Sequence, residues 1–330
     1  MKPSLEIGLH AAVIAVDGDH PQFLTVAGTA ADGKLRDGLP FGPYNPNEHR
    51  TLDVGLRNWV EDQTRLRLGY VEQLYTFGDS GRLRDSMING SNFVSVGYLA
   101  LVRKPGSQHQ NTSLSWNSWY EHFPWEDWRQ GPPTLLTEQI IPALGDWVQM
   151  APDERSSASG LDRLFRFQLA FGCELPKSGS VKIVSWDEER VLERYELMYE
   201  AGLVDEAAID GQITTTAPPK GPGKPMLHDH RRILATAIAR LRGKLKYRPV
   251  VFELLAERFT LTELQQTVET LSGQKLHKQN FRRLVEKGEL VEPTGATSSQ
   301  TGGRPAAYFR FRRSILKERP APGLRVGSRS

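Results

Sequence analysis

A segment of regular apolar spacing near the end of the chain restricts its fold more than any other feature. Between residues 261 and 271 the apolar side chains recur at intervals of three and four, which is the spacing of one buried helix face: Leu261, Leu264, Val268 and Leu271. Thr260 and Glu263 have the spacing of a capping box, in which each side chain bonds the backbone of the other residue. We therefore expect a helix over residues 262–271.

A second helix and a strand follow this one. The sequence predicts the helix over residues 278–287, with Gly288 as a left-handed cap, and an alternating strand over residues 307–312. Between them, residues 294–303 form a turn rich in Gly, Ser and Thr. Helix, helix and then a β-hairpin with a basic tip is the order of a winged helix-turn-helix, in which the second helix enters the major groove of DNA.

The second helix has one apolar side and one hydrogen-bonding side. Phe281, Leu284 and Val285 form the apolar side. The other side consists of residues that can donate hydrogen bonds to phosphates or base edges: Lys278, Gln279, Asn280, Arg282 and Arg283. We expect the first four of these to approach base edges. Phosphate contacts are expected from three arginines of the helix and the wing, namely Arg283, Arg304 and Arg310.

Charge separates the chain into an acidic and a basic part. Residues 224–330 hold 22 Lys and Arg against 9 Asp and Glu, a net charge of +13, whereas residues 1–223 have a net charge of −10. A charged run is most often only a solvated surface, but here the positive charge coincides with the winged-helix pattern. The sequence therefore predicts a double-stranded DNA operator as the partner of the C-terminal part.

The composition is that of an ordinary globular protein. The 330 residues are 38% hydrophobic and 25% charged, which suits two domains with cores of their own. Cys173 is the single cysteine, so an internal disulfide and a cysteine-rich zinc site are excluded. No apolar run approaches the length of a membrane span and no signal peptide is recognisable, so we expect a cytoplasmic protein without membrane association.

The first hundred residues predict an α/β sandwich. Short β-branched segments over residues 9–16 and 23–26 predict a hairpin, and residues 51–64 predict a helix that follows a loop containing Gly and Pro. Two more strands are expected over residues 69–77 and 93–102. The expected fold class is therefore α/β (or α+β), with a sandwich domain followed by a winged helix-turn-helix domain.

Short motifs in both parts point to one family. Gly42, followed after five residues by Glu48, reproduces the opening of the Nudix box, G-x5-E-x7-R-E-U-x-E-E-x-G-U. LYTFGD and VSVGYLAL in the sandwich, and HKQNFRRL and TGGRPAAYFRF in the basic part, complete the pattern. In these motifs the chain resembles the Nudix-related transcriptional regulators of NAD metabolism, over about residues 5–104 and 247–313. The resemblance implies a Nudix-like domain joined to a winged helix, and a repressor of NAD biosynthesis genes.

The helix after the box departs from the catalytic Nudix pattern. Catalytic members hold Mg²⁺ with several carboxylates on one helix turn. Here Leu56 and Arg57 stand where the box has Arg and Glu, and a one-residue insertion would place Asn58 at the first Glu. We therefore predict no catalytic residue, no metal site and no enzyme activity. The alternative is an active Mg²⁺-dependent hydrolase of ADP-ribose-type substrates with an accessory nucleic-acid-binding domain, because three acids remain: Glu48, Glu61 and Asp62.

A nucleotide pocket can persist without catalysis. The resemblance implies ADP-ribose, NAD or ATP as an effector and no required cofactor; a regulator that senses an unrelated molecule is a third alternative. Arginines commonly bind pyrophosphates. The candidate effector-binding residues lie around the box and after the glycine-rich turn at residues 78–81, and each can equally be a surface charge: Glu48, Arg50, Arg57, Glu61, Arg82 and Arg84.

The domain boundaries are predicted from composition. Residues 214–225 are rich in Pro, Gly and Thr, and they form the predicted linker between a Nudix-like domain over 1–213 and a winged-helix domain over 226–318. Residues 319–330 predict a disordered tail. Residues 105–133 predict an irregular insertion whose aromatic residues either stack on a nucleotide base or, as we favour, fill the core or a dimer contact.

The remaining segments predict helices over residues 135–150, 161–171, 188–201 and 227–245 and a strand over residues 181–186. The last of these helices is basic. It either carries a signal between the domains or contributes to a homodimer, whose two recognition helices would meet two half-sites on the operator.

Overall fold

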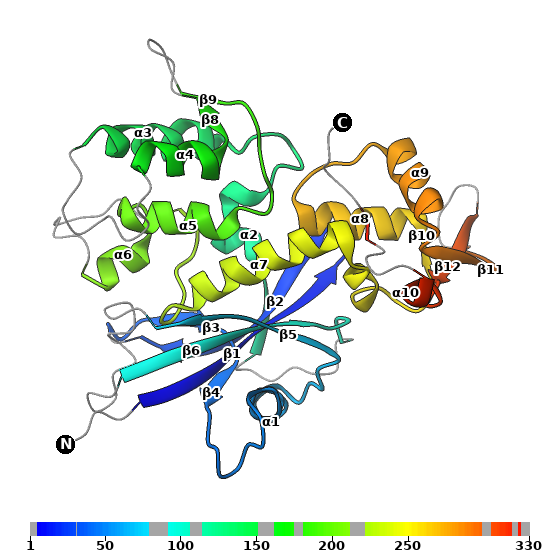
Figure 1. Ribbon diagram of the computed structural model, residues 1–330, viewed down its shortest axis with the longest axis horizontal. Coiled ribbons are helices and arrows are strands. Elements are labelled where there is room, and N and C mark those ends of the chain that lie inside the picture. The colour runs from blue at the N-terminus through cyan, green and yellow to red at the C-terminus, as the bar shows by residue number, and fades with distance from the viewer. Residues whose placement is uncertain are drawn as a thin grey trace.

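The computed structural model contains a mixed α/β body and a smaller C-terminal unit of helices and a β-hairpin (Figure 1). It describes residues 5–30, 32–78, 92–105, 114–150, 162–174, 181–211, 222–298, 305–318 and 323–324. The α/β class expected from the sequence is confirmed. Most of the predicted linker, and most of the predicted tail, lie outside the described residues.

The centre of the body is a sheet to which the described residues contribute seven strands: β1 (Leu5–Asp17), β2 (His20–Thr29), β3 (Leu35–Gly38), β4 (Phe41–Pro43), β5 (Tyr70–Phe77), β6 (Asn92–Leu101) and β7 (Leu114–Ser118). The strands run in the order β3-β2-β1-β6-β5, with β4 paired to β1 and β7 paired to β2. β1 and β6 are parallel, in register from Leu5 opposite Asn92 to Ile14 opposite Leu101. The other pairs are antiparallel.

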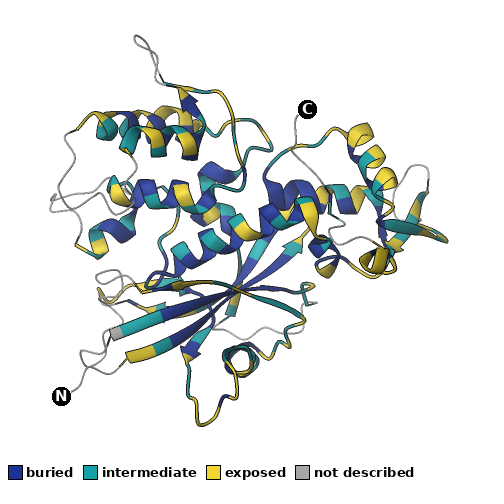
Figure 2. Ribbon diagram, viewed as in Figure 1, coloured by how far each residue is buried: buried dark blue, intermediate teal, exposed yellow. Residues whose placement is uncertain are grey.

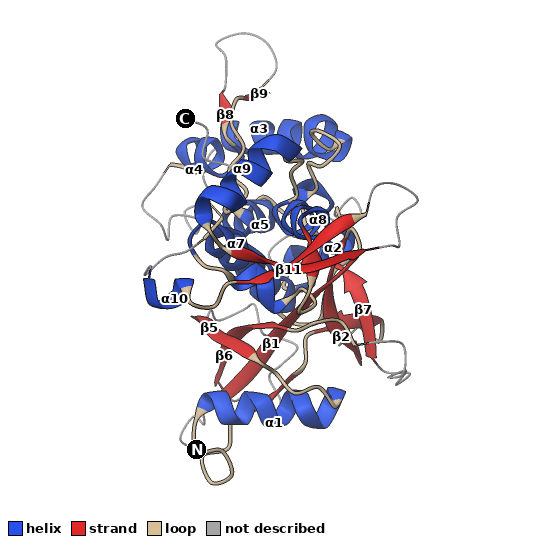
Figure 3. Cartoon of the chain, turned by 90° about the vertical axis from the view of Figure 1, so that its right-hand side faces the viewer, coloured by secondary structure: helices blue, strands red, loops and turns tan. Residues whose placement is uncertain are grey.

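The sheet is covered on both faces, because the residues of β1 alternate between two cores. One face packs against α1 (Leu52–Thr64), where Leu56 and Val60 meet three residues of β1: Leu9, Ala11 and Val13. The alternate residues Ala12 and Ile14 belong to a larger core under the other helices. Figures 1 and 3 show α1 on the side of the sheet opposite those helices. The predicted sandwich is confirmed.

The larger core lies under a layer of helices. They are a π-helical turn (Leu136–Ile140), α3 (Ile141–Gln149), α4 (Arg163–Phe171), α5 (Val191–Glu200), α6 (Asp205–Ile209) and α7 (His230–Tyr247), with a small hairpin of β8 (Cys173–Glu174) and β9 (Lys182–Ile183). The four helices predicted from apolar spacing are confirmed, with ends that differ by a few residues. The strand predicted over residues 181–186 is reduced to β9.

The segment predicted as an irregular insertion is largely regular where it is described. It contains β7, α2 (Trp119–His122) and a 3₁₀ turn over Pro124–Glu126. The prediction of irregularity was wrong because pairing of β7 with β2 decides the conformation, and no short pattern in the sequence reveals that pairing. The favoured interpretation, that aromatic residues here fill the core, is confirmed for three fully buried side chains: Trp119, Phe123 and Trp125.

Helix α7 packs against both parts of the chain. On the body, the guanidinium of Arg232 lies 4.9 Å from the centre of the Phe77 ring in β5. Further along, Nε of Arg242 donates to the carbonyl oxygen of Leu271, at 3.0 Å, near the end of α8 (Leu261–Ser272). The predicted domain boundary at residue 226 therefore falls just before a helix that both parts contact.

The C-terminal unit has the elements of a winged helix-turn-helix: a 3₁₀ turn (Val250–Glu253), β10 (Phe259–Thr260), α8, α9 (Lys278–Gly288), β11 (Val291–Ser298), β12 (Ala306–Phe311) and α10 (Ile315–Glu318). The capping box is confirmed, since the N–H groups of Glu263 and Thr260 each donate to the other side chain, at 3.2 and 2.6 Å. The left-handed residue after α9 is Glu289, with φ 50°, and Gly288 lies inside the helix. The predicted cap was therefore one residue early, because the chain turns at Glu289 to bring the buried Leu290 into the core.

The tail contacts α7 at Gly323 and Leu324. Leu324 is 1% exposed, and its N–H donates to the carbonyl of Leu245 at 2.9 Å. Disorder was predicted here from the Pro, Gly and Ser content, and at these two residues the burial of Leu324 against the helix overrides that tendency.

Two buried histidines connect β1 to the start of α7. The N–H of Leu39 donates to Nδ1 of His230 at 3.0 Å, so the proton of His230 is on Nε2, which lies 2.9 Å from Nδ1 of His10. Burial lowers the pKa of His10 to about 3. Burial and the neighbouring histidines also lower the pKa of His230 well below its ordinary value. Both rings are therefore neutral at pH 7.

We expect the free energy of unfolding to fall as the pH decreases below about 6.5. From that pH downward the unfolded chain takes up protons at its histidines, while the folded chain keeps these two rings neutral until well below it. Each ring then lowers the free energy of unfolding by about 2 kcal/mol between pH 7 and pH 5. Urea unfolding at the two pH values measures the loss.

The variant His10→Asn is the informative one, because it removes one titrating ring and retains an acceptor for the N–H of His230. The loss of stability between pH 7 and pH 5 should shrink by about 2 kcal/mol in this variant. It should persist in His20→Asn, which changes an exposed histidine. An equal pH dependence in all three proteins would contradict the assignment.

Candidate DNA interface and effector-binding region

Helix α9 presents its hydrogen-bonding side to solvent (Figure 2). Phe281 and Val285 are buried in the core, as the apolar spacing predicted. The side chains expected to contact DNA from this helix are all exposed, and none of them forms an ion pair with another described residue: Lys278, Gln279, Asn280, Arg282 and Arg283. Three cationic and two amide side chains are thus available on one helix face.

The wing carries further basic residues. Nε of Arg310 on β12 lies 2.6 Å from the carboxylate of Glu292 on β11, and both side chains are exposed. Arg304 lies outside the described residues. Arg312, which the sequence did not single out, donates to the carbonyl oxygen of Glu289 at 2.8 Å. This bond ties the end of the wing to the end of α9.

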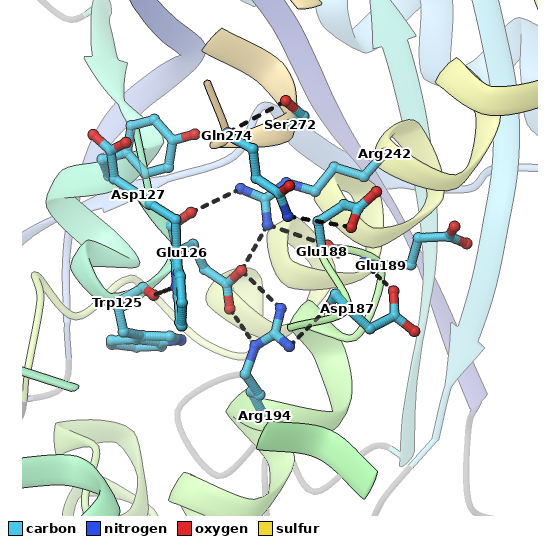
Figure 4. A network of polar contacts seen from close by, with 12 residues as sticks. Trp125, Glu126, Asp127, Asp187, Glu188, Glu189, Arg194, Arg242, Ser272 and Gln274 are labelled. Atoms are coloured by element: carbon cyan, nitrogen blue, oxygen red, sulfur yellow. Dashed lines mark hydrogen bonds and ion pairs between the residues drawn. The ribbon is translucent and has the colours of Figure 1, made fainter. Parts of the chain in front are cut away.

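A buried carboxylate holds the C-terminal unit on the body (Figure 4). Glu126 accepts from Nε and Nη2 of Arg194 at 2.6 and 2.9 Å and from Nη1 of Arg242 at 2.6 Å, and all three side chains are fully buried. Arg242 also donates to the carbonyl oxygens of Leu271 and Glu188, at 3.0 and 3.1 Å. Burial acts to raise the pKa of Glu126, but the two guanidinium groups hold that pKa below its usual range. The carboxylate is therefore ionised at neutral pH.

Sequence reasoning missed this network, because its members come from three distant segments that contain no motif. The available signal was a glutamate inside an aromatic run, between Trp125 and Trp128. A charged residue that is buried in such a setting requires a partner of opposite charge. The sequence cannot say which of the many arginines provides it.

The candidate effector residues on α1 have partners of their own. Nε of Arg57 donates to Asp53 at 2.9 Å, and its Nη1 donates to the carbonyl oxygen of Leu68 at 2.5 Å. Glu61 pairs with Arg67 at 2.9 Å. These contacts fix the loop that follows α1 to the helix.

The other candidate effector residues are exposed or not described. Glu48 and Arg50 are exposed on the turn before α1. Arg82 and Arg84 lie outside the described residues. In the described part of the chain, no group of three or more His, Cys, Asp and Glu residues is arranged to hold a metal ion. No described helix is long and apolar enough to cross a membrane.

The two parts together define the class of fold. A mixed sheet between α1 and a second helical layer, with α1 after the loop of Gly42 and Glu48, is a Nudix-like sandwich. The order α8, α9 and the β11–β12 hairpin is a winged helix-turn-helix. The chain is thus a Nudix-like domain followed by a winged helix.

Comparisons with known proteins identify the type of winged helix. Residues 251–311 match the NrtR DNA-binding winged helix domain. The chain is 41% identical over 83 residues to a protein of Acinetobacter baylyi described as an ADPR responsive transcriptional repressor, NtrR, and this alignment covers 25% of the chain and 33% of that protein. The match thus spans about a third of the length of this curated relative.

Solved structures extend the likeness to nearly the whole chain. Shewanella oneidensis NrtR in complex with a 27mer DNA superposes with a TM-score of 0.54 at 19% identity, over 94% of this chain and 95% of that one. A MutT/nudix family protein from Enterococcus faecalis gives 0.51 at 15% identity, over 94% and 89%. At this identity the likeness establishes the fold. The resemblance inferred from the motifs is confirmed: the chain has the fold of NrtR, with a winged helix of the NrtR type.

We expect Arg57→Ala to destabilise the protein. The substitution leaves Asp53 and the Leu68 carbonyl without their donor, which should lower the free energy of unfolding by about 1–2 kcal/mol. Arg50→Ala changes an exposed arginine of the same region and should shift it by less than about 0.5 kcal/mol. Urea unfolding of the two variants measures the difference. Equal effects would contradict a supporting role for Arg57.

Proposed function

We propose that this protein is a transcriptional repressor that binds DNA through its winged helix and an NAD-related nucleotide through its Nudix-like domain. The observation that carries the proposal is the exposed hydrogen-bonding face of α9, in a domain that matches the NrtR DNA-binding winged helix. A relative of this chain is described as an ADPR responsive transcriptional repressor, and a protein of the same fold has been crystallised with DNA. The proposed targets are NAD biosynthesis genes.

In this proposal α9 enters the major groove of the operator. Lys278, Gln279, Asn280 and Arg282 read base edges, while Arg283, Arg304 and Arg310 bind phosphates. Arg310 first has to leave Glu292, which costs little because an exposed ion pair contributes about 0–1 kcal/mol. Two copies of the chain form a homodimer, so that two α9 helices meet half-sites about 34–36 Å apart.

The effector is ADP-ribose, with NAD and ATP as the other nucleotides of the same chemistry. Glu48 and Arg50 on the exposed turn before α1 and the arginines Arg82 and Arg84 are the proposed contacts for its hydroxyl and pyrophosphate groups. Arg57 and Glu61 belong to the same region but already have protein partners. We therefore expect them to hold the site in shape and not to contact the nucleotide. Nucleotide binding lowers DNA affinity through a coupling free energy between the two sites.

We propose that the Nudix-like domain binds its nucleotide without hydrolysing it. Mg²⁺ in a catalytic Nudix site needs several carboxylates on one helix turn. Here the helix offers Glu61 and Asp62, and Glu61 is paired with Arg67. No metal or other cofactor is required for the proposed activity.

We expect tight binding to operator DNA that ADP-ribose weakens. Fluorescence anisotropy on the DNA upstream of the gene itself and on promoters of NAD biosynthesis genes measures it, with each nucleotide added in turn. The salt concentration is held fixed, because phosphate contacts make affinity steeply dependent on salt. A scrambled duplex of equal length is the control.

Two results would contradict this function. One is equal affinity for operator and scrambled DNA at physiological salt. The other is Mg²⁺-dependent release of AMP from ADP-ribose that Glu61→Gln abolishes, which supports the alternative of an active hydrolase.

Two variants of α9 distinguish base contacts from phosphate contacts. Asn280→Ala should cost about 1–3 kcal/mol on the operator and little on scrambled DNA, because a base contact is lost. Arg283→Ala should weaken binding to both duplexes and reduce the dependence of log K on log salt by about one charge. Arg67→Ala removes one exposed positive charge from the body. It should change neither the affinity for the two duplexes nor its dependence on salt. Identical profiles for Asn280→Ala and Arg283→Ala would contradict the assigned roles.

A further inference from the structure

The C-terminal end of α8 is capped by groups from the body. The carbonyl oxygen of Thr270 accepts a hydrogen bond from the hydroxyl of Tyr120 at 2.9 Å, and that of Gly273 accepts one from the backbone N–H of Trp128 at 2.8 Å. Arg242 donates to the Leu271 carbonyl between them. The last carbonyls of a helix have no partner within the helix and need one elsewhere. Here that need is met by two body segments, the aromatic segment after β7 and helix α7.

These donors are themselves held firmly. Tyr120 lies on α2, the short helix that follows directly on β7, and its neighbour Trp119 is fully buried in the larger core. Arg242 is fixed by the Glu126 carboxylate, which Arg194 of the helical layer also binds (Figure 4). Removing one member of a buried ion network leaves an unpaired charge, so these groups cannot separate one at a time. Arg242 is thus tied by buried ion pairs to Glu126, which lies in the same segment as Tyr120 and Trp128.

The turn between α8 and α9 is bound to the same place. Gly273 has a φ of 74°, and a Cβ on it would collide with the carbonyl oxygen of Glu126, so the body approaches the turn as closely as glycine permits. Within the turn, the carboxylate of Glu269 accepts the N–H of Leu276 and the ammonium of Lys275, each at 3.0 Å. Helix α9 begins directly after, at Lys278. The orientation of α9 therefore follows the end of α8.

A cleft opens between α8 and the body. A cleft of about 390 Å³ is lined by Asp127, Arg129 and Gln130 of the body and by α8 residues from Thr262 to Thr270. Among the described residues, the hydrogen bonds given above between α8 and the body lie at its C-terminal end, so that a small displacement there changes the direction of α9.

We propose that Tyr120, Trp128 and Arg242 are positioning residues for the DNA-reading helix: they clamp the C-terminal end of α8 to the body and so set the angle at which α9 is presented. This inference rests on the proposed function, in which α9 reads the operator. It assigns to the aromatic segment a part in DNA recognition that it performs without touching DNA. A movement of this segment relative to the sheet reaches α9 through the clamp.

Tyr120→Phe tests the clamp, because it removes the hydroxyl that binds Thr270 and keeps the ring. Tyr199→Phe is the matched control, since its hydroxyl binds Asp210 at 2.7 Å between α5 and α6, away from α8. We expect Tyr120→Phe to lower operator affinity about fivefold, the factor that corresponds to one hydrogen bond of about 1 kcal/mol, with affinity for scrambled DNA and its salt dependence unchanged. Tyr199→Phe should leave both affinities unchanged.

A distance measurement separates failure of this inference from failure of the proposed function. Spin labels at Leu35→Cys on the exposed end of β3 and at Glu286→Cys on the exposed side of α9 report the orientation of α9 without DNA. The labelled protein is mixed with an excess of unlabelled protein, so that a homodimer carries one labelled copy. Pulsed electron paramagnetic resonance should then give one narrow distance in the parent and in Tyr199→Phe, and a shifted or broadened one in Tyr120→Phe. An unchanged distance in Tyr120→Phe overturns the inference. So does an operator affinity that falls only in step with affinity for scrambled DNA. A parent protein that binds no operator removes the proposed function, while the distance result still decides whether the clamp sets the angle of α9.

Discussion

The contact of Glu126 with two arginines joins three segments of this molecule. The carboxylate comes from the segment that follows the sheet strand β7, Arg194 comes from α5 in the helical layer, and Arg242 comes from α7. Without Glu126, two guanidinium groups would be buried with no counter-charge, which typically costs several kcal/mol. The positions of the sheet, the helical layer and the C-terminal unit therefore depend on one another through this carboxylate.

Helix α7 therefore contacts both the sheet and the C-terminal unit. It covers the face of the sheet opposite α1, and so completes the sandwich, and it also carries Arg242 to the end of α8. In a chain whose two domains met only through a linker, the winged helix would be free to swivel. Here a helix with eleven buried residues lies between them, so the body and the C-terminal unit are expected to move as one piece.

Local patterns in the sequence predicted the elements whose structure depends on neighbours along the chain. The capping box of Thr260 and Glu263 and the two-sided character of α9 are of this kind. The sequence did not predict the pairing of β7 with β2 or the Glu126 network, because both join residues that are distant in sequence and share no spacing. The same holds at the candidate site: the exposed face of α9 was predictable, whereas the engagement of Arg57 with the loop after α1 depends on the tertiary fold.

The late position of α7 in the chain has a consequence for biosynthesis. The last described strand of the sheet ends at Ser118, but the helix that covers one face of the sheet ends at Tyr247. At ordinary rates of translation the ribosome needs roughly ten seconds to add that stretch. During this time the apolar face that carries Ala12 and Ile14 has no α7 against it, so the nascent chain passes through a stage at which chaperone binding competes with aggregation.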